Sequence, residues 1–210
     1  MLNFFKTPAL VFGFFCLLVL NSSFKCTGKT DTGITAQDAE SKHIYTIETE
    51  VGDIVIQVYP KKAPITVKNF LQYVENENFE GASFYRVVRI DNQPVNPKKI
   101  EVIQGNFIAG DLALPPIVHE TTNNTGILHK NGTVSMARLD PGTASAAFFI
   151  CINDQPELDF EGKRNPDGQG FAAFGKVIEG MDIVKQIQSG KTDGQSLLKE
   201  IKIKRIYRQK

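Results

Sequence analysis

A long succession of short alternating segments, separated by turn residues, constrains the fold of this chain more than any other feature. Residues 45–50 and 54–59 alternate apolar and polar side chains on either side of Gly52-Asp53, which is the pattern of a β-hairpin. Further strand candidates are residues 83–90, 100–104, 132–137, 146–152, 171–177 and a last strand near 198–207. Because many short strands with few helices favour sheet closure over a layered α/β arrangement, we expect a mainly β fold, an antiparallel barrel.

Two segments have the pattern of helices instead. Pro64 suits a first helical turn, and it is followed by one apolar stripe at helical spacing, formed by Val67, Phe70, Leu71 and Val74. A second, shorter helix is predicted over residues 179–188, with Gly190 as its stop signal. The sequence therefore predicts two helices beside the strands.

The N-terminus differs from the rest of the chain. Residues 9–20 are apolar, follow Lys6, and are fewer than the ~20 residues that a membrane-spanning helix needs. We predict a secretory signal peptide over residues 1–23, so that the protein is exported to the periplasm or cell envelope. An uncleaved membrane anchor is the alternative, and Cys26 stays open as a lipid-modified cysteine, although Lys25 fits such a site poorly.

The remaining chain is interpreted as a flexible polar linker, residues 24–42, and one folded domain, residues 43–210. The net charge of +1 gives no reason to expect a nucleic-acid partner. Cys151 is interpreted as a small buried hydrophobic residue, and His119-Glu120 as a loop pair without a metal. A monomer is the default expectation.

The candidate site is one arginine, Arg86, in a part of the chain rich in phenylalanine. The phenylalanines concerned are Phe84, Phe107, Phe148, Phe149, Phe171 and Phe174. A guanidinium among apolar rings offers five hydrogen-bond donors in a fixed geometry. The sequence contains no evident nucleophile, metal cluster or phosphate-binding loop to accompany it. We therefore expect chemistry by desolvation and one well-aimed hydrogen bond, without a metal or cofactor.

From His43 onward the chain resembles the cyclophilins, a family of peptidyl-prolyl cis-trans isomerases. The motifs that carry the resemblance are Phe84-Tyr85-Arg86-Val87-Val88, Gln104-Gly105, Ser135-Met136-Ala137, Phe148-Phe149-Ile150 and Phe174-Gly175-Lys176-Val177. The resemblance implies a closed eight-stranded antiparallel β-barrel capped by two α-helices. It also implies an exported, bacterial-like isomerase of Xaa–Pro bonds that acts on proline-containing peptides and unfolded protein clients.

The resemblance also implies roles for single residues. Arg86 would donate to the prolyl nitrogen of the twisted bond, and Gln104 would orient Arg86 and contact the substrate backbone. The implied substrate-binding residues are Phe84, Met136, Ala137, Ala147, Phe148, Leu158 and Phe171. Phe149 is assigned to the core, since strand alternation would turn it away from a pocket that Phe148 faces.

Three features depart from the family pattern. Ala147 stands where many members have glutamine, and Glu157 where cyclosporin-binding members have tryptophan, so we expect weak or no cyclosporin inhibition. Residues 91–99 insert a proline-rich loop, which we interpret as a tolerated surface loop, with a role in peptide access as the alternative. The rival function is a proline-peptide-binding or chaperone module with little turnover; a hydrolase or structural envelope protein is more remote.

Overall fold

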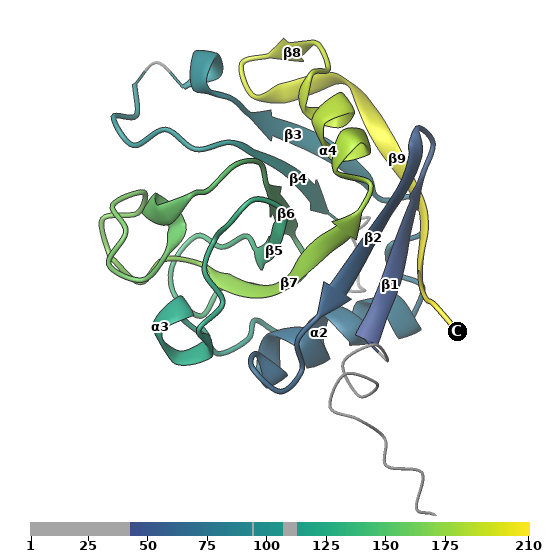
Figure 1. Cartoon of the computed structure of the whole chain (residues 1–210), viewed down its shortest axis with the longest axis horizontal. Helices are drawn as coiled ribbons and strands as arrows, with labels where there is room; N and C mark the ends of the chain where they lie inside the picture. The colour runs from purple at the N-terminus through teal and green to yellow at the C-terminus, as the bar shows by residue number, and fades with distance from the viewer. Residues whose placement is uncertain (1–42, 94, 107–112) are drawn as a thin grey trace, which may run out of the picture. The chain divides into compact units, whose positions relative to one another are not determined.

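The computed structural model describes residues 43–93, 95–106 and 113–210, and the predicted barrel is confirmed in them. The strands are β1 (Ile44–Thr49), β2 (Gly52–Val58), β3 (Ser83–Val88), β4 (Val102–Asn106), β5 (Thr133–Met136), β6 (Phe148–Cys151), β7 (Ala172–Glu179), β8 (Thr192–Asp193) and β9 (Ser196–Arg208). Eight of them follow the order β1-β2-β7-β5-β6-β4-β3-β9, and pairing of β1 with β9 closes the barrel (Figure 1). All pairs are antiparallel, and β8 adds only a short hairpin to β9.

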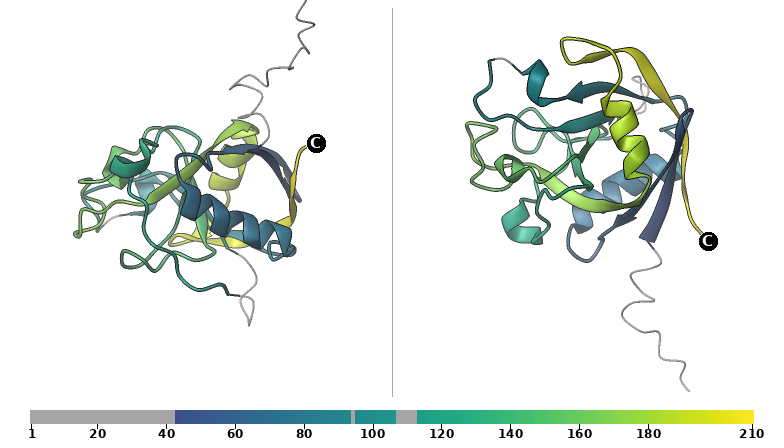
Figure 2. Two further views of the ribbon diagram at one scale, coloured as in Figure 1. Left: turned by 90° about the horizontal axis from the view of Figure 1, so that it is seen from below. Right: turned by 45° about the horizontal axis from the view of Figure 1, so that its top comes forward.

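The two predicted helices are α2 (Pro64–Glu75) and α4 (Met181–Gln188), which lie at opposite ends of the barrel (Figure 2). The second begins later than predicted because Gly180 precedes it with a left-handed φ of 87°. A side chain at position 180 would also clash with the carbonyl oxygen of Asp53. Glycine is therefore required at this junction between β7 and the helix. A third helix, α3 (Thr122–Thr125), is a single turn and too short to leave a periodic signal in the sequence.

Two short 3-10 helices, η2 (Ile90–Asn92) and η3 (Pro156–Leu158), interrupt the loops beside the site. None of the helices in residues 43–93, 95–106 and 113–210 has the length and apolar character that a membrane crossing requires. The predicted signal peptide, the linker over residues 24–42 and Cys26 lie outside the described residues.

The barrel interior holds a cluster of aromatic rings around Phe148. Its ring meets Phe70 of α2, Phe79 and Phe84 edge-on, with centroids 5.7–6.0 Å apart. Edge-to-face contacts of this kind add stability beyond the area that the rings bury. Gly105 leaves the space that these rings need, because a side chain there would lie 3.2–3.3 Å from Phe84 and Phe148.

A second, smaller apolar cluster lies on the outer side of the barrel. It consists of Val88, Ile100, Val102, Phe149, Cys151 and Leu158, with Ala137 and Phe171 packed against it. Strands β3, β4 and β6 therefore bury side chains on both faces, and Cys151 is confirmed as a buried free cysteine. The candidate site is built over this outer cluster.

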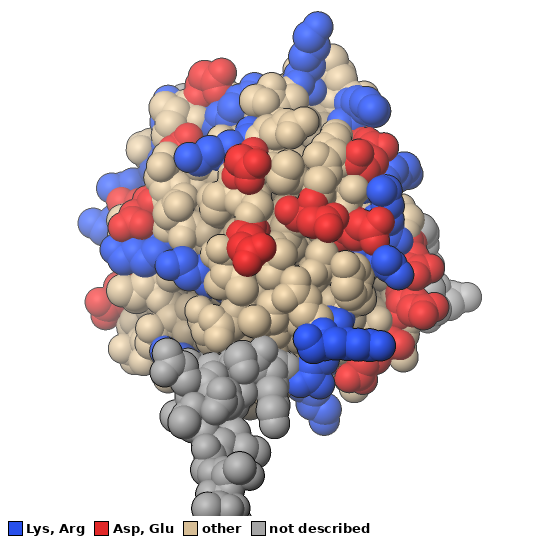
Figure 3. Space-filling view, turned by 45° about the vertical axis from the view of Figure 1, so that its right-hand side comes forward, with Lys and Arg blue, Asp and Glu red and all other residues tan. Residues whose placement is uncertain are grey.

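The side of the molecule that carries β1 and β9 has charged residues of both signs scattered among other residues (Figure 3). Glu48 of β1 accepts from Arg205 at 2.8 Å and lies 3.5 Å from Lys204, and both basic residues belong to β9. Lys202 and Lys204 are exposed, as expected for a solvated strand face. Such exposed ion pairs contribute little to stability.

Candidate functional site

A hollow of about 270 Å³ lies over the outer cluster, on the face that β3, β4 and β6 present. Apolar side chains form its floor and three arginines its rim. The lining residues are Arg86, Ile100, Val102, Gln104, Ala137, Arg138, Leu139, Phe149, Leu158, Arg164, Asn165 and Phe171. The combination is an apolar pocket of the size of a small side chain or ring, bordered by fixed cations.

A bulge in β3 turns Arg86 toward this hollow. Phe84 pairs with Gly105 and Arg86 with Gln104, so Tyr85 is the extra residue on β3. Phe84 points into the barrel, and two residues later strict alternation would also point Arg86 inward. The bulge resets the alternation and directs the guanidinium outward, which is a common use of bulges at functional sites.

Two glutamines hold the Arg86 guanidinium in place. Its Nη1 donates to Gln104 Oε1 at 2.6 Å, and its Nε and Nη2 both donate to Gln195 Oε1, at 3.0 and 2.5 Å. Gln104 in turn donates from Nε2 to the Tyr85 hydroxyl at 2.6 Å. The expected pairing of Gln104 with Arg86 is thus present, whereas Gln195, in the β8–β9 turn, had no signal in the sequence.

The charge of Arg86 is not neutralised by a neighbouring carboxylate among the described residues. Both of its acceptors are neutral amides. Burial lowers the pKa of Arg86 from its usual value, yet a guanidinium is so strong a base that it stays protonated at neutral pH. The hollow therefore contains a partly desolvated cation that is oriented but not compensated.

The structure brings some of the predicted substrate-binding residues to the hollow. Ala137, Leu158 and Phe171 line it together with Arg86 and Gln104. Ala147 lines a second, more open hollow, which shares Gln104 and Ala137 with the first. The two hollows therefore adjoin at β4 and the end of β5.

Phe84, Met136 and Phe148 do not lie where we expected them. All three are at most 1% exposed and belong to the barrel interior, whereas Phe149, which we assigned to the core, lines the hollow. We predicted correctly that Phe148 and Phe149 lie on opposite faces of β6, but we assigned the two faces the wrong way round. Side chains fill the interior of this barrel, so the hollow lies on its outer face.

The second arginine of the hollow, Arg138, is fully occupied by neighbouring groups. Its side chain is completely buried, it makes two bonds of 2.8 and 2.9 Å to the Asp167 carboxylate, and it donates to the carbonyl oxygen of Gly170. Its guanidinium also lies 5.1 Å from the centre of the Phe171 ring. Arg138 therefore fixes the position of Phe171, a role that sequence reasoning did not predict.

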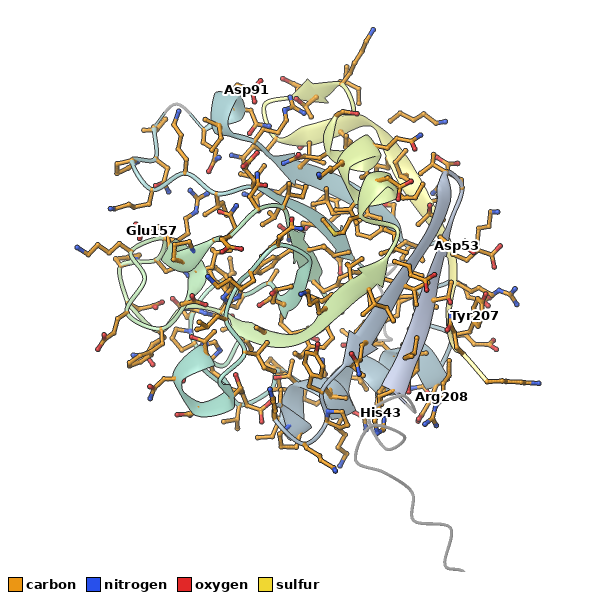
Figure 4. All side chains as sticks on the ribbon, viewed as in Figure 1. His43, Asp53, Asp91, Glu157, Tyr207 and Arg208 are labelled. Carbon is orange, nitrogen blue, oxygen red and sulfur yellow. The ribbon has the colours of Figure 1, made fainter. Side chains whose placement is uncertain are left out.

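The inserted loop is more than a tolerated surface loop. Gln93 is 3% exposed and donates to the carbonyl oxygens of Arg89 and Ile100, at 2.6 and 2.7 Å. The carbonyl oxygen of Asn92 accepts from Gln195, the residue that holds Arg86. Figure 4 labels Asp91, at the start of the loop, and Glu157, on the segment that lies beside it. The loop thus supports the rim of the hollow.

Three residues that could suggest other chemistry, His119, Glu120 and the buried His129, have structural contacts. Nε2 of His119 lies 3.1 Å from the carbonyl oxygen of Gln169. The Glu120 carboxylate accepts from the backbone nitrogens of Ile65 and Thr66, so it caps the first turn of α2. His129 lies between Asp159, 2.7 Å from Nδ1, and Ser135, 3.0 Å from Nε2. Ser135 is completely buried and cannot reach a substrate. No group of three metal-ligating residues occurs within the described part of the chain.

Fold and site together define a class of protein, a closed β-barrel that presents one oriented arginine beside an apolar hollow on its outer face. Comparison with known proteins agrees: the family described as cyclophilin type peptidyl-prolyl cis-trans isomerase/CLD matches residues 44–208.

The relatives are isomerases of this family. A peptidyl-prolyl cis-trans isomerase from Streptomyces antibioticus is 38% identical over 151 residues, which cover 70% of this chain and 83% of the relative. Peptidyl-prolyl cis-trans isomerase B from Escherichia coli is 35% identical over 147 residues, covering 68% and 82%. A crystal structure of a Cryptosporidium parvum cyclophilin, determined in the presence of the dipeptide Ala-Pro, shares the fold with a TM-score of 0.61 and 22% identity, over 80% of this chain and 99% of that one.

The chain belongs to the cyclophilin family of peptidyl-prolyl cis-trans isomerases. The predicted family, fold and enzyme class are confirmed.

Proposed function

We propose that this protein accelerates rotation about Xaa–Pro bonds of peptides and unfolded proteins, with Arg86 as the catalytic residue. The observation that carries the proposal is the Arg86 guanidinium, held by Gln104 and Gln195 beside an apolar hollow lined by Phe149 and Phe171. The hollow suits a prolyl ring, and the guanidinium suits the amide that precedes the ring.

The reaction needs no covalent intermediate. Amide resonance gives the Xaa–Pro bond a rotation barrier of about 18–20 kcal/mol. Twisting the bond removes the resonance and leaves a lone pair on the prolyl nitrogen. An N–H donor of Arg86 directed at that nitrogen stabilises the twisted state more than either planar state, and such differential stabilisation lowers the barrier.

The surroundings of Arg86 strengthen this effect. Gln104 and Gln195 fix the guanidinium before the substrate binds, so little reorganisation is needed during rotation. The apolar floor lowers the local dielectric constant and so strengthens the hydrogen bond to the prolyl nitrogen.

The experiment that tests the proposal compares turnover and binding in one variant. Exchange NMR on a short Ala-Ala-Pro-Phe peptide gives the rate of cis–trans exchange, and titration calorimetry gives its dissociation constant. We expect Arg86→Ala to lower kcat/KM by about 100-fold or more, the usual cost of removing one transition-state donor. Arg205→Ala removes an exposed arginine on β9 and should keep the wild-type rate.

The second candidate function is a proline-peptide-binding module with little turnover. The observation that favours it is Ala147, which lines the second hollow without a side-chain amide to hold a peptide backbone. If the wild-type protein binds the peptide but does not accelerate exchange, and Arg86→Ala changes only the affinity, the binding module replaces the isomerase.

We also propose that the protein is exported to the periplasm or cell envelope. The apolar run over residues 9–20 after Lys6 is the basis of this proposal. Mass spectrometry of the mature N-terminus tests it: loss of about the first 23 residues supports export, and a retained run in a cytoplasmic fraction contradicts it.

A further inference from the structure

Arg164 is a third guanidinium on the hollow, and it differs from the other two in its hydrogen bonds. Arg138 is neutralised by Asp167, and all three nitrogens of the Arg86 guanidinium donate to the two glutamines. Arg164 donates from Nη1 alone, to Gln93 Oε1 at 2.9 Å and to the carbonyl oxygen of Lys98 at 2.6 Å. Both acceptors are uncharged.

The inserted loop holds Arg164 in this position. Gln93 is buried and anchored on both sides of the loop, because it bonds to the backbone of Arg89 and of Ile100. One edge of the guanidinium is therefore fixed against a rigid acceptor pair. No bond from Nε or Nη2 of Arg164 to another group occurs in the described residues, which leaves that edge of the fork for a ligand.

Two carboxylates of the same segment, Glu157 and Asp167, are already engaged elsewhere. Glu157 lies 3.2 Å from the Lys98 ammonium and accepts from the backbone nitrogen of Lys163 at 2.9 Å. Asp167 is bound to Arg138. No ion pair with Arg164 occurs in residues 43–93, 95–106 and 113–210. Burial and the charge of Arg86 both lower the pKa of Arg164, so two uncompensated cations share the hollow.

The position of Arg164 indicates which part of a substrate it meets. The second hollow shares Gln104, Ala137, Arg138 and Leu139 with the first, but Arg164 lines the first hollow only. A peptide whose prolyl ring occupies the first hollow therefore has a residue that flanks the proline near Arg164.

We propose that Arg164 is a specificity-determining residue, which selects substrates with a carboxylate on one residue flanking the proline. This inference rests on the proposed function and names its substrate class: Xaa–Pro segments with a neighbouring Asp or Glu. A guanidinium fork is suited to a carboxylate because it can donate two parallel hydrogen bonds. Arg86 is a poorer partner, since three of its five N–H donors bond to Gln104 and Gln195 and the proposed function uses another for the prolyl nitrogen.

The test uses two pairs of peptides that differ only in charge. One pair has Glu or Gln directly before the proline, and the other has Glu or Gln directly after it. For each pair, the ratio of kcat/KM is measured by exchange NMR and the ratio of dissociation constants by calorimetry. We expect the protein to prefer the Glu peptide by about tenfold at one of the two positions, as for a hydrogen-bonded charge at a partly exposed site.

Three variants separate Arg164 from general charge effects. Arg164→Gln should bring the ratio to about one, and Arg164→Lys should leave an intermediate ratio, because it keeps the charge but loses the fork. Lys163→Gln removes an exposed charge one residue away and should keep the wild-type ratio. Added salt should reduce the wild-type preference.

The outcomes for Arg164 and for the proposed isomerase are distinguishable. If no peptide is isomerised, the proposed function fails, but the ratio of dissociation constants still tests Arg164. Equal values for Glu and Gln peptides at both positions would overturn the inference. So would a preference that Arg164→Gln leaves unchanged.

Discussion

At the scale of single residues, neighbours in the sequence have opposite roles in this barrel. Phe148 is the centre of the interior ring cluster, whereas Phe149 contacts Phe171 edge-on at 5.4 Å beside the hollow. One step along β6 therefore separates a residue that packs in the barrel interior from one that lines the hollow.

This difference predicts distinct effects of the same substitution. Phe148→Leu should lower the free energy of unfolding by about 1–2 kcal/mol and leave kcat/KM per folded molecule near the wild-type value. Phe149→Leu should lower kcat/KM by about threefold to tenfold, because the ring contact beside the prolyl site is lost. Urea unfolding and exchange NMR measure the two effects, and the reverse pattern would place the pocket on the inner face.

Glu157 predicts weak or no inhibition by cyclosporin. A largely apolar ligand that packs against this position must desolvate a carboxylate paired with Lys98 at 3.2 Å, and that costs binding energy. Inhibition of the peptide exchange rate by cyclosporin checks this. We expect cyclosporin to inhibit the Glu157→Trp variant more tightly than the wild-type protein. Tight inhibition of the wild-type protein would contradict the prediction.

At the scale of elements, the site depends on loops that are far from it in the sequence. The β8–β9 turn supplies Gln195, and the inserted loop supports both Gln195, through Asn92, and Arg164, through Gln93. In Figure 1, this loop lies next to the segment between β6 and β7 that carries η3.

Gln195→Ala should therefore impair catalysis through Arg86, because Gln195 holds the guanidinium and is given no direct role toward the substrate. Removing the acceptor leaves Nε and Nη2 of Arg86 unpaired and the guanidinium less well oriented, which we expect to lower kcat/KM by about tenfold. Ser196→Ala changes the next, exposed residue and serves as the matched control. Equal rates for the two variants would show that Gln104 alone is sufficient to orient Arg86.

The elements differ in how far the sequence predicts them. Alternation, turn residues and the apolar stripe of α2 locate the strands and both longer helices, because these signals are local. The bulge at Tyr85, the direction in which β6 faces and the approach of Gln195 to Arg86 are consequences of barrel closure, and no local pattern reports them. Arg164 could have been noticed only as a cation near the pocket segment, since its anchor Gln93 lies in an insertion.

At the scale of the whole molecule, a buried histidine links stability to pH. His129 is enclosed between Asp159, Ser135 and the stacked ring of Phe149. Burial lowers the pKa of His129 from 6.5, and the hydrogen bond to Asp159 offsets only part of this effect. His129 therefore binds a proton at a lower pH in the native state than in the unfolded chain, where it does so near pH 6.5.

We thus expect the free energy of unfolding to fall as the pH drops from about 7 to about 5, because the unfolded state binds more protons over this range. Above the unfolded pKa both states hold a neutral His129, and its contribution no longer changes with pH. Urea unfolding at several pH values measures the slope, and His129→Gln should flatten it. An equally steep slope in that variant would assign the effect to other groups.

The central claim is that orientation of the Arg86 guanidinium, and not its charge alone, accelerates Xaa–Pro rotation. The most direct test is the exchange rate of the Ala-Ala-Pro-Phe peptide with Arg86→Lys, which keeps the positive charge but cannot donate to Gln104 and Gln195 and to the prolyl nitrogen in one fixed geometry. We predict that this variant loses most of the acceleration, by about tenfold or more relative to the wild type. Exchange as fast as in the wild-type protein would contradict the account.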